Sequence, residues 1–421
     1  MMIKLRLTVL SFLQFFIWGS WLITIATFWF ANKGWGPEEF GKIFSTMGIS
    51  ALFMPAIAGI LSDRFINAEK LYGILHILGG VGLCLVPLAE NPGEMFWYIL
   101  ITMLFYMPTI SLSNTVMYAI LSRDKEVDMV KAFPPIRVWG TVGFIVALWT
   151  ISLTGHESDE FQFYLGGVVS FILGIYSFSL PACPPLGRNL ERKGFLQALG
   201  LNAFALFKNY RYAVFFLFAM LLGAALQLTN AYGDVYLHSF DKVDSFKNSI
   251  AVQYPAIISS IAQISETLFI LAIPFFMKRF GIKQIMLISM IAWVLRFGLF
   301  AYGDPGSGLW MIVLSCIIYG MAFDFFNISG SLFIEKSVAP EIRASAQGLF
   351  TMMVNGVGAV LGSRISGYVM EKYFTTYHEI DGKKIPEINW HGTWLSFTAY
   401  AAVVAVLFVL LFREKKEIQK A

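Results

Sequence analysis

Apolar segments of about 20 residues recur from one end of this chain to the other, and they constrain its fold more than any other feature. A helix of about that length crosses the roughly 30 Å hydrocarbon core of a bilayer. Backbone amides and carbonyls must be hydrogen-bonded within the chain inside lipid, so such segments are expected to cross as helices. We expect twelve membrane-spanning helices, over residues 8–31, 40–62, 70–90, 95–121, 137–156, 161–181, 211–239, 255–277, 284–303, 309–336, 343–373 and 390–413.

The composition also indicates a membrane protein and excludes several other classes. Charged residues make up 14% of the chain and hydrophobic residues 57%, whereas soluble domains have about 25% charged residues. The three cysteines, Cys84, Cys183 and Cys316, show neither metal-site nor disulfide spacing. A phosphate-binding glycine loop is missing, which excludes an ATP-driven pump of that class. We therefore expect no cofactor, no metal and no nucleic-acid partner.

The basic residues are distributed unequally between the two sides of the membrane. With twelve spans, one side receives both termini and the loops that follow the even-numbered spans, and 22 of the 31 lysines and arginines lie there. The opposite side carries seven, and Arg296 and Arg364 lie within spans. Cytoplasmic loops carry the excess of lysine and arginine in membrane proteins. The distribution therefore predicts that both termini face the cytoplasm.

The longest polar break lies near the midpoint of the chain, over residues 182–210. We interpret it as a cytoplasmic linker between two six-helix bundles, residues 1–181 and residues 211–421. An all-α integral membrane protein with two such halves is the predicted fold.

Short internal similarities support a repeat of the two halves. Residues 137–144 and 343–350 both begin with arginine, have a small residue three positions later and a glycine soon after, and end with phenylalanine. Residues 55–65 and 274–280 both begin with proline and end with a basic residue followed by phenylalanine. These pairs fit two halves related by an axis along the membrane normal.

Two acidic residues are expected at membrane depth. Asp324 lies in the segment YGMAFDFFNISGS, residues 319–331, inside the tenth span, and Glu266 lies inside the eighth. A charge there is expensive and usually faces the protein interior or a water-filled pathway for substrate or ions. Two acids on separate spans of one half therefore predict a transport role. The alternative is that they only hold helices together.

Other polar and aromatic residues form small groups at helical spacing within four spans. The alternative role for an isolated amide is a hydrogen bond between helices, and Arg137 could extend to the cytoplasmic interface. As a binding site, these amides and hydroxyls suit an uncharged, polyhydroxylated molecule, and the aromatic rings suit a flat base. The groups are Arg137, Thr141 and Phe144; Gln227 and Asn230; Gln263 and Glu266; and Tyr319, Phe323 and Asn327.

Five segments resemble the nucleoside:proton symporter family of the major facilitator superfamily. The resemblance covers nearly the whole chain. It rests on LSFLQFFIWGSWL at 10–22, FPPIRVWGTVGFI at 133–145, LNAFALFKN at 201–209, QISETLFILAIPFF at 263–276 and YGMAFDFFNISGS at 319–331. The segment that ends in Asp63 and Arg64 also resembles the G-x-x-x-D-R loop with which the superfamily holds its cytoplasmic gate together, although the basic residues that usually follow are missing.

The resemblance implies proton-coupled import of purine and pyrimidine nucleosides, such as uridine, across a bacterial inner membrane by alternating access. It implies a monomeric transporter in the lipid bilayer, not an enzyme. Asp324 matches an acid linked to proton coupling in the family, a role that Glu266 could share. The positions that match the family's substrate contacts are Arg137, Thr141, Phe144, Gln227, Asn230, Gln263, Glu266, Tyr319 and Phe323.

Other functions remain open from the residues alone. A sugar or oligosaccharide proton symporter would share the fold and the polar character of the site. A receptor that binds a nucleoside without moving it is a candidate from another class, although the terminal tails leave little room for a signalling domain. A membrane enzyme is not supported, because the sequence shows no nucleophile–base or metal spacing.

Overall fold

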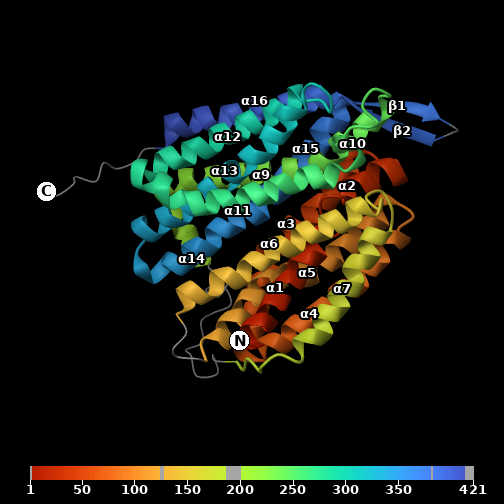
Figure 1. Cartoon of the computed structure of the whole chain (residues 1–421). Helices are drawn as coiled ribbons and strands as arrows, with labels where there is room; N and C mark the ends of the chain where they lie inside the picture. Colours follow the sequence, from red (N-terminus) through yellow and green to blue (C-terminus); the bar gives the residue numbers. More distant parts are fainter. Residues whose placement is uncertain (1, 124–127, 186–200, 381–382, 413–421) are drawn as a thin grey trace.

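The long helices form two groups that lie side by side in the structure (Figure 1). The structure is a computed structural model that describes residues 2–123, 128–185, 201–380 and 383–412. Helices α1 to α7, red to yellow in Figure 1, form the N-terminal half, and helices α9 to α16, green to blue, form the C-terminal half. The predicted all-helical membrane fold is confirmed.

The bounds of the elements follow the expected spans closely. The N-terminal half contains α1 (Met2–Gly19), α2 (Ile25–Thr27), η1 (Phe28–Lys33), α3 (Pro37–Arg64), α4 (Ala68–Leu85), η2 (Val86–Leu88), α5 (Pro92–Leu121), α6 (Met129–Leu153) and α7 (Phe161–Ser177). The C-terminal half contains η4 (Leu201–Lys208), α9 (Tyr210–His238), η5 (Ser239–Lys242), α10 (Ile250–Gln253), α11 (Pro255–Arg279), α12 (Ile282–Tyr302), α13 (Leu309–Ser337), α14 (Pro340–Thr351), η6 (Met352–Gly358), α15 (Ala359–Phe374) and α16 (Trp390–Leu411).

Ten helices in the described part of the chain are long and apolar enough to cross a membrane. The two other expected spans do not form one uninterrupted helix of spanning length, each for its own reason. The first is interrupted by a turn after Gly19, so that α1, α2 and η1 together cover it. The sixth, α7, has 17 residues, which at 1.5 Å per residue gives about 26 Å. That length still approaches the thickness of the hydrocarbon core.

Proline positions explain where several helices begin. Pro37, Pro92, Pro255 and Pro340 each stand at the start of a helix, where a missing amide hydrogen costs nothing and the fixed backbone angle favours the helix.

The start of α6 differs from the expected one. Span 5 was expected to start after Pro134 and Pro135, but α6 begins at Met129 and contains both prolines. The prolines remove two backbone donors, so the unpaired carbonyls fall in the first turn of the helix. Both prolines are exposed.

Two paired strands occupy most of the segment that the expected spans leave as a loop between residues 373 and 390. Strand β1 (Thr375–Ile380) pairs antiparallel with β2 (Lys383–Ile388), and Thr375 lies opposite Ile388. The expected loop residues Asp381 and Gly382 lie outside the described residues. Asp-Gly between two strand-forming segments is a frequent hairpin signal, so the sequence did contain an indication of this element.

The hairpin distinguishes the two ends of the molecule. We call the end that carries β1, β2, loop 154–160 and loop 239–254 the hairpin end; β1 and β2 stand at the upper right of Figure 1. The termini end carries the start of α1 and the last turn of α16. There Tyr210 Oη donates a hydrogen bond to the Leu411 carbonyl over 3.2 Å.

Hydrogen bonds join the two halves on the hairpin side. Thr27 Oγ1 donates to Asp234 Oδ2 over 2.6 Å, and Trp149 Nε1 donates to Ser260 Oγ over 2.9 Å. Each bond connects one residue of the N-terminal half to one of the C-terminal half, so the structure is closed at this end.

Helix α3 of the N-terminal half also approaches η6 and α15 of the C-terminal half very closely. A Cβ atom at Gly48 would lie 2.8 Å from the Gly356 carbonyl oxygen, and one at Gly41 would overlap the Ser363 carbonyl. Small residues allow this backbone-to-backbone packing between membrane helices. The two halves therefore approach to backbone distance here, with the Leu52 and Val360 side chains beside the contact.

Candidate functional site

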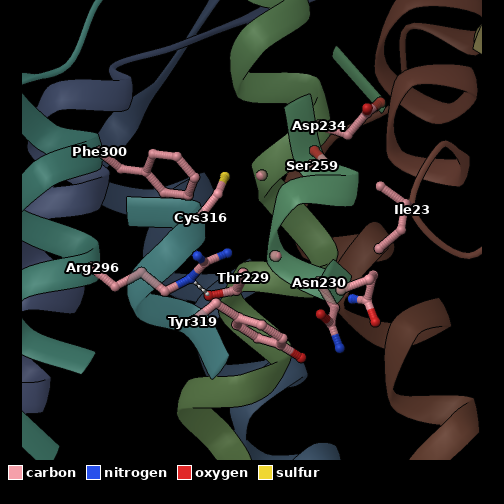
Figure 2. Close-up of a pocket in the computed structure, with 12 residues that line it drawn as sticks. Ile23, Thr229, Asn230, Asp234, Ser259, Arg296, Phe300, Cys316 and Tyr319 are labelled. Atoms are coloured by element: carbon pink, nitrogen blue, oxygen red, sulfur yellow. Dashed lines mark hydrogen bonds between the residues drawn. The ribbon is translucent and has the colours of Figure 1, made fainter. Parts of the chain in front are cut away.

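A cavity lies at the centre of the C-terminal half, and one residue of the N-terminal half closes its side (Figure 2). About 360 Å³ of space not occupied by atoms lies between its walls, a figure that includes space open to solvent. Helices α9, α11, α12 and α13 provide the walls, and Ile23 enters from the turn after α1. Its lining residues are Ile23, Thr229, Asn230, Gly233, Asp234, Ser259, Ala262, Gln263, Arg296, Phe300, Cys316 and Tyr319.

Three of the predicted substrate-binding residues line this cavity. They are Asn230 on α9, Gln263 on α11 and Tyr319 on α13. The amides offer donors and acceptors, and the buried tyrosine offers a ring and a hydroxyl. The structure therefore brings together residues from three separate spans, as a binding site requires.

Phe323 and Asn327 line a neighbouring hollow rather than the main cavity. Phe323 stands one helical turn after Tyr319, and their rings stack with centroids 5.9 Å apart. The aromatic face expected on α13 therefore exists, but it extends from one hollow into the next.

The other predicted binding residues lie in neither of these two hollows. Thr141 and the buried Phe144 lie on α6, and Gln227 is buried on α9, one turn before Asn230. Helix α6 packs against α11 of the other half. Their contact with a ligand is not apparent from this arrangement of the two halves.

Charges connect Arg137, Glu266 and Asp324. Arg137 on α6 interacts electrostatically with Glu266 on α11, across the boundary between the halves. The Arg137 guanidinium also lies 4.1 Å from the centre of the Phe15 ring. Glu266 interacts in turn with Asp324 on α13. Three ionisable side chains therefore lie within electrostatic range of their neighbours, from one half to the other.

Asp324 is the least satisfied of these three side chains. It is buried, and its Oδ2 atom has no hydrogen-bond partner among the described residues. A buried carboxylate oxygen without a donor is costly if it is charged. A proton on this carboxyl group would remove most of that cost.

Asp63 and Arg64 lie away from the cavity, in the last turn of α3. Asp63 is exposed and Arg64 is partly buried. Helix α11, which the repeat pairs with α3, likewise contains an internal proline and ends at Arg279. The matching ends agree with the internal similarity seen in the sequence.

Arg296 is a central residue that the sequence reasoning did not select. It is 3% exposed, its Nε donates to Thr229 Oγ1 over 3.2 Å, and its Nη1 donates to the Ser315 carbonyl over 2.6 Å. Its guanidinium lies 4.7 Å from the centre of the Tyr319 ring. Figure 2 shows Arg296 and Tyr319 on the same wall. An arginine inside a span was the available signal, since intramembrane charges mark functional sites.

Comparisons with known proteins agree in fold and in family. A family described as nucleoside H+ symporter matches residues 1–417. The nucleoside permease NupG of Escherichia coli is 49% identical over 99% of this chain and 97% of its own length. The xanthosine permease of Escherichia coli is 47% identical over 100% of this chain and 98% of its own length.

Solved structures give the same result for the fold. A crystal structure of the nucleoside transporter NupG superposes with a TM-score of 0.90 at 49% identity, covering 99% of this chain and 100% of that chain. The inward-open xylose transporter XylE from E. coli superposes with a TM-score of 0.67 at 14% identity, covering 99% and 98%. At that identity the second likeness concerns the fold alone, which is that of the major facilitator superfamily.

Proposed function

Because this chain belongs to the nucleoside H+ symporter family, we propose that its central cavity binds the nucleoside that it transports together with protons. The protein is a multi-pass nucleoside proton symporter, as the five sequence segments indicated. Family membership favours nucleosides over the sugar alternative and a transporter over a sensor or an enzyme. The observation that carries the proposed site is the convergence of Asn230, Gln263 and Tyr319 on one cavity.

The cavity residues suit the two parts of a nucleoside. Asn230 and Gln263 can bond the sugar hydroxyls and the polar edge of the base, since amides donate and accept. Tyr319 and Phe323 offer stacked rings for a flat base. Both purine and pyrimidine nucleosides fit this chemistry, because ring stacking does not depend on the identity of the base.

The remaining predicted contacts belong to a second arrangement of the halves. Arg137, Thr141 and Phe144 lie on α6 of the N-terminal half, and closing the halves around the substrate would bring α6 toward the ligand. Alternating access moves one half against the other around a fixed site. Gln227 and Glu266 complete the proposed set from the C-terminal half.

Asp324 is the proposed proton carrier, with Glu266 as its partner. A nucleoside without charge gains nothing from the membrane potential, so its accumulation requires a second species moving downhill. The buried, unpaired Oδ2 atom of Asp324 and its electrostatic link to Glu266 and Arg137 support this role. A proton on Asp324 would be released when a donor or a cation approaches.

The proposed orientation puts both termini in the cytoplasm of a bacterial cell, with the protein in the inner membrane as a monomer. The excess of basic residues at the termini end supports it. The closed hairpin end then faces outward, and the proposed cytoplasmic gate includes Asp63 and Arg64. The proposed boundaries are residues 1–181 and 211–421 for the halves and 182–210 for the linker, of which 186–200 lie outside the described residues.

Uptake of labelled uridine into proteoliposomes under an imposed inward proton gradient tests this function. We expect accumulation above the outside concentration, collapse by a protonophore, and competition by unlabelled purine and pyrimidine nucleosides. Xylose or an oligosaccharide in excess serves as the control and should not compete. Uptake that ignored the gradient, or that a sugar displaced, would contradict the proposal.

A further inference from the structure

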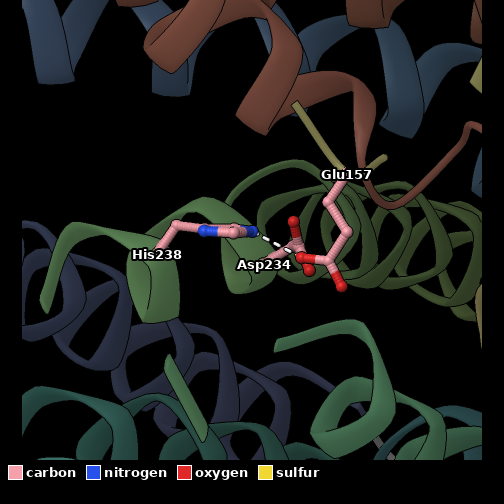
Figure 3. Close-up of side chains that lie close together, drawn as sticks. All are labelled: Glu157, Asp234 and His238. Atoms are coloured by element: carbon pink, nitrogen blue, oxygen red, sulfur yellow. Dashed lines mark hydrogen bonds and ion pairs between the residues drawn. The ribbon is translucent and has the colours of Figure 1, made fainter. Parts of the chain in front are cut away.

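Three side chains that could bind a metal ion gather at the hairpin end (Figure 3). Glu157 comes from the loop between α6 and α7, and Asp234 and His238 stand one turn apart on α9. Each offers one ligand atom, and the three atoms lie within 4.8 Å of one another. Sequence spacing could not reveal this group, because Glu157 lies 77 positions before Asp234.

The group contains more acidic than basic side chains. Glu157 is 4% exposed and Asp234 is 1% exposed, so both carboxylates are largely removed from water. The charged groups that act on Asp234 are Glu157 and His238, and Asp241 adds a third acid near His238. Two carboxyl groups face one imidazole here, and a bound cation would favour the ionised form of both acids. Buried carboxylates in such surplus are expensive unless a cation compensates them.

One ligand atom is also without a partner. Asp234 Oδ2 accepts the hydrogen bond from Thr27, whereas Asp234 Oδ1 is buried and has no hydrogen-bond partner in the described part of the chain. Figure 3 shows the Asp234 carboxyl group beside that of Glu157 and facing the His238 ring. A buried acceptor directed into a cluster of possible ligands is what a bound cation would satisfy.

We propose that Glu157, Asp234 and His238 bind a divalent transition-metal ion, for which Zn²⁺ is the matching probe. Imidazole nitrogen and carboxylate oxygen bind zinc at about 2.0–2.2 Å, so ligand atoms around a tetrahedral ion stand about 3.3 Å apart. His238 Nε2 and Glu157 Oε2 are 2.5 Å apart and would separate by about 1 Å. The His238 side chain is 26% exposed, which gives the ion an entry path and the fourth position a water.

The ion would connect the two halves. Glu157 belongs to the N-terminal half, and Asp234 and His238 belong to the C-terminal half. Alternating access requires the hairpin ends to separate. An ion that binds all three ligands is held only while this end is closed, and it shifts the equilibrium toward that state. Zinc is therefore an inhibitor of transport; this one consequence rests on the proposed function.

Zinc titration of the purified full chain tests the site itself. We expect one ion per chain by calorimetry, and tetrahedral Co²⁺ absorption bands when cobalt replaces zinc. Glu157→Gln and His238→Gln should each weaken zinc binding at least tenfold. His156→Gln is the matched control, because His156 lies in the same loop and pairs with the partly exposed Asp159; it should bind zinc like the parent.

Stoichiometric binding that both variants leave unchanged, or no binding by the parent, would overturn the site. Gel filtration and uridine binding of each variant show that it is folded, so that lost zinc binding is not lost structure.

The transport experiment then tests the connection between the halves. Zinc should slow uridine uptake by the parent and by His156→Gln, but not by Glu157→Gln. Zinc that binds without slowing uptake would overturn closure of the hairpin end by the ion. Failure of the zinc-free parent to take up uridine would contradict the proposed function instead, and it would leave the titration result unaffected.

Discussion

The central cavity and the hairpin-end group both contain buried acids, but their partners differ. Among the ionisable side chains beside the cavity, Asp324 keeps an unpaired oxygen, and its resolved electrostatic partner is another acid, Glu266. At the hairpin end, Glu157 contacts His238 and accepts from the Ala256 amide over 3.3 Å. Those partners come from the opposite half. An acid with an unpaired oxygen, such as Asp324, suits proton transfer, whereas an acid bonded across the halves, such as Glu157, stabilises one conformation. Asp234 combines the two features, because Thr27 binds one of its oxygens across the halves and the other is unpaired.

The largest effect is expected from Asp324→Asn, which tests whether the acid beside the cavity carries the proton. Asp324→Asn preserves the shape of the side chain but cannot release a proton, so uridine accumulation against a gradient should be abolished. Uridine exchange without a gradient should persist. Proteoliposome uptake measured with and without an imposed proton gradient checks this. A folded variant that still concentrated uridine, with proton uptake unchanged, would remove Asp324 from the coupling.

Arg296→Gln should have the next largest effect, on binding rather than coupling. The change removes hydrogen bonds from a charged donor, worth about 1.5–3 kcal/mol each, and the contact that holds the Tyr319 ring. We expect uridine binding to weaken about tenfold or more by calorimetry. Arg296→Lys tests whether charge alone suffices; full affinity in both variants would show that Arg296 does not position Tyr319.

Removal of a single amide side chain from the cavity should weaken uridine binding less than Arg296→Gln does. Asn230→Ala and Gln263→Ala each remove one neutral hydrogen bond, worth about 0.5–1.5 kcal/mol, so the dissociation constant for uridine should rise several-fold. Gln227 lies outside the described cavity, so Gln227→Ala should raise the dissociation constant for uridine only if the halves close around the substrate. Parental affinity in all three would contradict the proposed pocket.

The smallest effect is expected from Thr27→Val at the hairpin end. This change removes one hydrogen bond to Asp234 and keeps the volume of the side chain. Uridine affinity should stay within about twofold of the parent, because Thr27 does not line the cavity. Labelling of a cysteine placed at Ser259, inside the cavity, should become faster from the hairpin side. Unchanged labelling would show that this bond does not hold the end closed.

The helices were predicted well from the sequence because membrane spans can be recognised by their length and hydrophobicity. Each long helix follows from an apolar segment, and several begin at a proline such as Pro37 or Pro255. The start of α6 was misplaced because Pro134 and Pro135 lie in its second turn, and the sequence does not show that the helix continues through them. The hairpin was missed because the Asp381-Gly382 signal lies in a short polar segment between two strong spans.

The site was predicted in part, for a different reason. Asn230, Gln263 and Tyr319 were selected because polar residues at helical spacing stand out in apolar spans, and they line one cavity; their contact with substrate stays a prediction. Arg296 was passed over because nothing in its own span shows that Thr229 and Tyr319, from other spans, lie beside it. The hairpin-end group was invisible for the same reason: only packing of the two halves brings Glu157 to His238.

We expect Gly41 and Gly48 to mark the axis about which the two halves rotate. At these positions α3 contacts the backbone of η6 and α15. Because the backbones approach so closely at these two points, we expect one half to rotate against the other about them when one end opens and the other closes. A methyl group at either glycine would push the two backbones apart. It would change which end of the molecule is closed at rest as well as how tightly the halves pack.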